Sequence, residues 1–124
     1  MSPYHVFTGI VRNVERRLMG EARRILRESM TPAEAAGLEN ESVIVRLTLR
    51  YALASGFGVP IRDAALAAVF ARDERGEPHP PRSDLDFQRV ENEIVGRFAH
   101  AADRMAEYAT PHVLRAVEAR RKGA

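Results

Sequence analysis

Apolar side chains recur every three or four residues over most of this chain, and this spacing places them on one face of an α-helix. The first such stretch follows Ser2, which can cap a helix ahead of a proline at the first helical position, and it predicts one long helix over residues 3–29. A second stretch follows Ser83 and predicts another long helix as far as Tyr108. Thr110-Pro111 then predicts a stop and the start of a last helix.

Shorter helices are expected between the two long ones. Residues 31–34 read Thr-Pro-Ala-Glu, a capping box in which the hydroxyl and the carboxylate each accept from a backbone N–H that lacks a helical partner. This motif predicts a short helix over residues 32–38. Residues 59–72 are rich in alanine and predict a second short helix. The proline-rich segment 77–82 is expected to be an extended surface linker.

Residues 42–55 admit two interpretations. Their apolar residues alternate as in a strand, but as a helix the same segment is apolar nearly all round, with Arg46 and Arg50 on a narrow polar edge. We favour a helix, because no other segment offers a strand partner, and we expect it to end at the glycines of residues 55–58. The predicted fold of residues 1–124 is a single all-α domain, a small helical bundle with two long antiparallel helices and three shorter helices.

The overall composition excludes several classes of protein. The chain has 19 basic and 17 acidic residues and a net charge of +2, so a uniformly basic coat for nucleic acid is excluded, although a local basic face is not. It has no cysteine, which rules out disulfides, thiolate metal sites and cysteine nucleophiles. The longest charge-free stretch, residues 51–61, is far shorter than a membrane span. We therefore expect a cytoplasmic protein with no membrane contact.

Arginines gather on the polar side of the first predicted helix. On a helical projection they lie opposite the apolar stripe, and two glycines share their face: Arg12, Arg16, Arg17, Arg23, Arg24, Arg27, Gly9 and Gly20. Guanidinium groups in such a row can bind the phosphates of nucleic acid, RNA or DNA, or an acidic surface of another protein subunit. The alternative is a solvated helix face, partly neutralised by Arg17–Glu21 and Arg24–Glu28 pairs.

Arg46 and Arg50 form a second candidate binding site. Two guanidinium groups on a largely apolar segment must either reach the surface or be paired, and Glu39, Glu41 and Asp63 are the acids close by in the sequence. Contact with a ligand or with a partner protein is the other interpretation.

Catalytic and cofactor motifs are not found. His100, Asp103 and Glu107 share one side of a predicted helix, but neither the di-iron nor the His-Glu-x-x-His pattern is present, so we expect no metal and no cofactor. Arg97 and His100 resemble the Arg-then-His pair of helical ribonucleases of the HEPN type. That family separates the two residues by four to six positions, whereas two intervene here. We expect no enzymatic activity.

The favoured hypothesis is a non-catalytic subunit of a larger assembly that binds a nucleic-acid backbone or an acidic partner through its arginines. Small helical subunits of RNA-guided effector complexes and helical phage adaptors are similar to this chain in size and class. The alternative is a DNA-binding regulator, because residues 31–50 resemble a helix-turn-helix. The sequence leaves open RNA or DNA as the ligand, the oligomeric state, including a homo-oligomer, and the role of the proline-rich linker.

Overall fold

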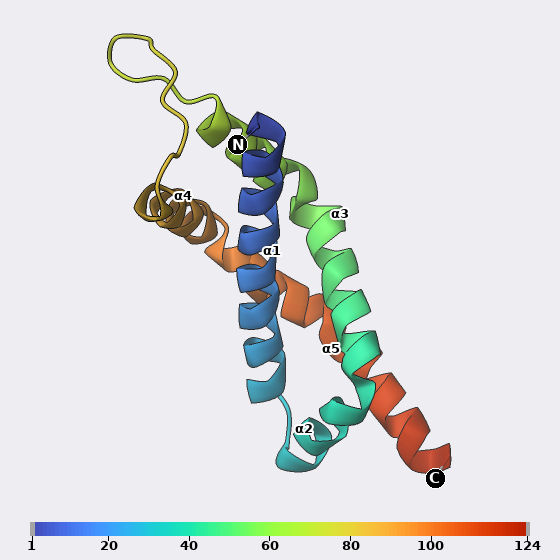
Figure 1. The fold of residues 1–124 in the computed structure, drawn as a ribbon. Helices are drawn as coiled ribbons and strands as arrows, with labels where there is room; N and C mark the ends of the chain where they lie inside the picture. Colours follow the sequence, from blue (N-terminus) through green and yellow to red (C-terminus); the bar gives the residue numbers. More distant parts are fainter. Residues whose placement is uncertain (1, 124) are drawn as a thin grey trace.

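The computed structural model describes residues 2–123, and every regular element in that range is helical (Figure 1). The elements in chain order are α1 (Pro3–Glu28), α2 (Pro32–Leu38), the 3₁₀ turn η1 (Glu39–Glu41), α3 (Ser42–Val69), α4 (Asp84–Arg97) and α5 (Ala99–Gly123). The prediction of an all-α bundle is confirmed. Three helices are long, however, with 26, 28 and 25 residues for α1, α3 and α5.

The three long helices pack against one another and enclose the core, while α4 lies beside the N-terminal half of α1 (Figure 1). Each contributes fully buried side chains, among them Ile10 and Leu18 from α1, Leu49 and Leu53 from α3, and Met105 from α5. Burying side chains of this size stabilises the fold by roughly 1.5–3 kcal/mol each. The core therefore fixes how α1 and α3 lie side by side.

Helix starts follow the predicted capping signals. The Ser2 hydroxyl accepts from the backbone N–H of His5. Thr31 and Glu34 form the complete capping box at the start of α2. Ser83 accepts from the backbone N–H of Asp86 at the start of α4. Each cap satisfies a backbone donor that the first helical turn leaves without a partner, which is why these starts could be recognised locally.

The predicted helix end at residues 55–58 and restart at residue 59 are wrong, because α3 continues to Val69. Neither Gly56 nor Gly58 has the positive φ of a helix-ending glycine, and Figure 1 shows α3 changing direction near its middle instead of stopping. Pro60 costs about 3 kcal/mol inside a helix. Leu53 and Ile61, which are fully buried on either side, together outweigh that cost.

The second long helix also differs from its prediction. The chain breaks at Phe98, where α4 ends with φ −109° and ψ 25°, and it does not stop at Thr110-Pro111. The Thr110 hydroxyl donates to the carbonyl of Ala106, and Pro111 is exposed, so solvent can hydrate the carbonyl that this proline leaves without a donor. The break lets Ile94 in α4 and Ala101 in α5 both reach the interior.

Residues 77–82, which were predicted to be an extended surface linker, are not helical, and the segment between α3 and α4 folds back on itself through a bridge between Arg72 and Pro78. Gly76, with φ 79°, forms the turn.

A single stretch in residues 2–123, Pro32–Val69, contains a window long and apolar enough to cross a membrane by length and composition. Core helices of soluble proteins share this property, and α3 packs against both α1 and α5.

Candidate functional site

A groove of about 740 Å³ runs between α1 and α3, and arginines from both helices line it. The helices lie side by side there, with α1 supplying Arg12, Arg16 and Arg23 and α3 supplying Arg46, Arg50 and Arg62. We call these six residues the groove arginines. One acidic residue, Glu15, shares the lining, so the groove carries a net charge of +5. Because the whole chain has a net charge of only +2, the rest of the molecule is net negative.

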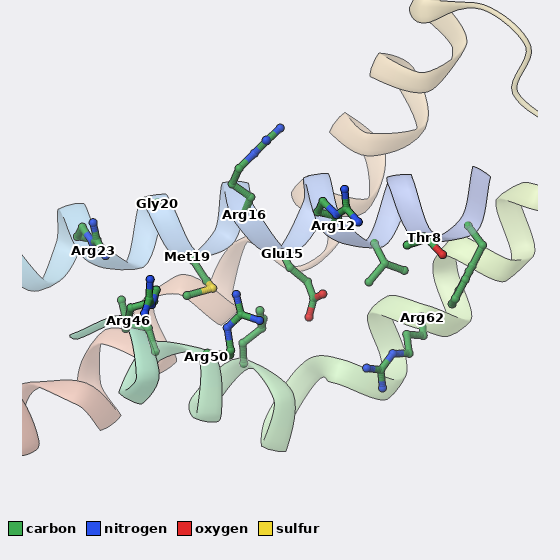
Figure 2. A pocket seen from close by; sticks show the side chains of 14 residues that line it. Thr8, Arg12, Glu15, Arg16, Met19, Gly20, Arg23, Arg46, Arg50 and Arg62 are labelled. Carbon is green, nitrogen blue, oxygen red and sulfur yellow. The ribbon is translucent and has the colours of Figure 1, made fainter. Parts of the chain in front are cut away.

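The close-up shows how the charged side chains are arranged (Figure 2). Arg46 and Arg50 extend from α3 toward α1, and Glu15 and Met19 extend from α1 toward α3. Arg16 points away from α3, and its Nη2 donates to Oδ1 of Asn13 at 2.9 Å. The groove therefore has charged edges on two helices, with Arg16 on the outer side of one edge.

The groove arginines have no acidic partners among the residues that the structure describes. Within residues 2–123 none of the six is in an ion pair, although every one is exposed. Successive arginines four residues apart, such as Arg12 and Arg16 or Arg46 and Arg50, are separated by about 6 Å along the helix axis. Two rows of unpaired guanidinium groups at this spacing can each donate forked hydrogen bonds to the oxygens of an anion.

The other three predicted arginines lie outside the groove and already have partners. Arg17 donates from Nη1 to Oδ1 of Asn92 in α4 at 2.7 Å. Arg24 forms ion pairs with Glu21 and Glu28 of α1, and its hydrogen bond to Glu21 lowers the pKa of the Glu21 carboxyl. Arg27 lies 3.4 Å from the Glu39 carboxylate. The predicted arginine face thus divides into a free row and a paired row.

Some of the predicted pairings form and others do not. The Arg24–Glu28 pair is present at 2.7 Å, whereas Glu21 pairs with Arg24 and not with Arg17. The acids proposed as partners of Arg46 and Arg50 are engaged elsewhere: Glu39 with Arg27, and the buried Glu41 with Arg120. Asp63 is exposed and is in no ion pair within the described residues.

Two charged residues of the lining, Arg62 and Glu15, were not predicted from the sequence. Arg62 was not predicted because the glycines of residues 55–58 indicate a helix end, which separates Arg62 from the helix of Arg46. Had residues 42–69 been predicted as one helix through Pro60, Arg62 would have been placed on the same helix as Arg46 and Arg50. Glu15 is half-buried between the polar and apolar faces of α1, a position that a projection leaves undecided.

The residues around His100 do not form a comparable site. His100, Asp103 and Glu107 line an open surface hollow with Arg104 and Tyr108. Within residues 2–123 no group of three His, Cys, Asp or Glu side chains is arranged to hold a metal ion. The His100 ring packs edge-on against Phe57, with ring centroids 5.5 Å apart, a contact that joins α5 to α3.

Comparisons with known proteins give this chain no relative. No family model matches it, and neither curated proteins nor solved structures gave a match. The groove must therefore be interpreted from its own chemistry.

Proposed function

We propose that this protein is a non-catalytic subunit of a larger assembly and that it binds the phosphate backbone of nucleic acid in the groove between α1 and α3. The observation that carries the proposal is that six arginines without ion pairs, three from each of two helices, line one groove. Arginine binds phosphate oxygens through its planar fork, and each neutralised phosphate releases condensed counterions. A polyanion with regularly spaced charges fits two rows of guanidinium groups better than a small anion does.

The assembly part of the proposal rests on apolar side chains at the surface. On α3 these are Val43, Ile44, Leu47, Tyr51, Val59 and Leu66, each between 40% and 65% exposed. Apolar surface on this scale commonly marks contacts with other proteins. The binding surface for nucleic acid and the surface for other subunits would then share one helix.

The alternative of a helix-turn-helix regulator has less support. Residues 31–50 do contain a short helix followed by another, but α3 is a core helix in which Val45 and Leu49 are buried against the rest of the bundle. A recognition helix must lie in the major groove with one face free for base edges. On α3 the free face is largely apolar.

Binding of labelled RNA and DNA, followed by fluorescence anisotropy at two salt concentrations, tests the proposal. The groove variant Arg23→Gln/Arg46→Gln removes one guanidinium from each side. We expect its affinity to fall by about tenfold or more and the slope of log affinity against log salt to fall by about two, since each lost phosphate contact removes about one unit.

The matched control is Arg24→Gln/Arg27→Gln, which also removes two positive charges but takes them from arginines of α1 that lie outside the groove. It should stay within about twofold of the parent protein if the groove, and not overall charge, binds the ligand. Equal losses in both variants, or no binding of any probe at about 50 mM salt, would overturn the proposal. Circular dichroism checks that both variants remain folded.

A further inference from the structure

We infer, on the basis of the proposed function, that the groove holds a single strand with its bases facing inward, and that Glu15 selects bases that carry an amino group. The inference starts from the floor of the groove, which is apolar and lies between the two rows of arginines. Phe7 and Met19 form its accessible surface, and the buried residues Val11, Leu49 and Leu53 complete its lining. Phe7 and Met19 are only half-buried, so the phenyl ring and the thioether are available for contact.

An apolar floor fits a single strand better than a duplex. A duplex presents phosphates and sugars on its outside, and a phosphate pressed against Phe7 and Met19 would lose hydration without gaining a donor. A single strand can turn its phosphates toward the arginines and its bases toward the floor. Bases stack on aromatic side chains with little dependence on sequence, and the polarizable sulfur of methionine also packs well on flat rings.

Glu15 gives the groove a second, more selective feature. Its side chain points from α1 toward α3, between Arg50 and Arg62 in the view of Figure 2. Although arginines line both sides, Glu15 is in no ion pair and no side-chain hydrogen bond within residues 2–123. A carboxylate in this position repels phosphate and accepts hydrogen bonds, so the group that it faces in the complex must be a donor.

Bases provide such a donor only on some of their edges. Cytosine carries an amino group at C4 and adenine carries one at C6, whereas thymine has a carbonyl oxygen at C4. A carboxylate accepts from the cytosine amino group and repels the thymine oxygen at the same position. The single donor of thymine, N3–H, lies between two carbonyl oxygens that also repel a carboxylate. Glu15 is therefore a specificity-determining residue that favours cytosine over thymine, two bases of nearly equal size.

The experiment compares oligo-dC, oligo-dT and a mixed-sequence duplex of equal length, each about 15 nucleotides, at neutral pH and low salt. The parent protein should bind oligo-dC at least about fivefold more tightly than oligo-dT, since the cytosine amino group donates to Glu15 and the thymine oxygen at the same position cannot. It should bind both single strands more tightly than the duplex. In Glu15→Gln the ratio of the two pyrimidine affinities should fall to about one, because an amide can also donate to thymine.

The control Glu28→Gln makes the same change on the same helix outside the groove, and it should preserve the ratio. Tighter binding of the duplex, or a dC-to-dT ratio that Glu15→Gln leaves unchanged, would overturn this inference. Those outcomes leave the proposed function standing as long as Arg23→Gln/Arg46→Gln still loses affinity. If that arginine variant binds like the parent protein, the proposed function fails and the inference fails with it.

Discussion

Helices α1 and α3 have nearly equal lengths and pack side by side, but their side chains are distributed in opposite ways. Helix α1 has one buried apolar stripe and a polar remainder, with Tyr4 its single exposed large apolar residue. Helix α3 has apolar residues on nearly every side, beside a narrow edge of arginines, and keeps several large apolar residues at the surface. The periodicity of α1 therefore identifies its inner face from sequence, whereas that of α3 does not. The groove arginines come equally from both helices.

The largest expected effect on stability comes from comparing a buried and an exposed leucine on α3. Leu49 is fully buried and Leu47 is 55% exposed, although both are leucines on one helix. Leu49→Ala should lower the free energy of unfolding by about 2–5 kcal/mol. Leu47→Ala should change it by less than about 0.5 kcal/mol. Urea unfolding measures both, and Leu18→Ala in α1 serves as the reference for a buried leucine.

Equal losses for Leu47→Ala and Leu49→Ala would mean that the exposed side of α3 is covered in solution. Helix α3 would then no longer differ from α1 in exposing large apolar residues, because a partner would cover them.

Glycines test whether α3 is continuous. Gly9 in α1 and Gly56 in α3 each have open space where a Cβ would lie. Gly56→Ala should raise the free energy of unfolding by about 0.5–1 kcal/mol, like Gly9→Ala, because alanine has less backbone freedom to lose. If Gly56 instead ended a helix in the left-handed conformation, the same change would destabilise the protein. Thermal unfolding of the two variants side by side distinguishes these cases.

The smallest expected effect on stability comes from the ion pair between Glu21 and Arg24 on α1. The Arg24 hydrogen bond lowers the pKa of Glu21 below its usual value of 4.5, so the pair contributes stability above that pH and loses it as the pH falls through the lowered pKa. Glu21→Gln should therefore flatten the loss of stability on acidification. Arg24→Gln removes this pair together with the Arg24–Glu28 pair and should flatten it at least as much. Urea unfolding between about pH 6 and pH 3 measures the slope, and an unchanged slope in both variants would contradict the pairing.

The candidate site could be predicted only in part. Five of the eight predicted arginines line the groove, and they came from two separate predictions, the row on the first helix and the pair at residues 46 and 50. Nothing local to either segment indicates that the two sets face each other across one groove. Arg17, Arg24 and Arg27 share a helical face with the groove arginines, but their partners come from α4, from α1 itself and from η1. A helical projection contains no neighbouring elements and cannot separate free arginines from paired ones.

The sequence by itself determined the helical class, the starts of α1, α2 and α4, and the inner face of α1. These follow from short-range interactions, since a cap satisfies a donor within three residues and an apolar stripe repeats within one turn. Tertiary structure alone decided that α3 continues through Pro60, that α4 and α5 separate at Phe98, and which arginines share the groove. The reason is the size of the free energies involved. A glycine or proline inside a helix costs about 1–3 kcal/mol, and burying a few large side chains between helices contributes more than that.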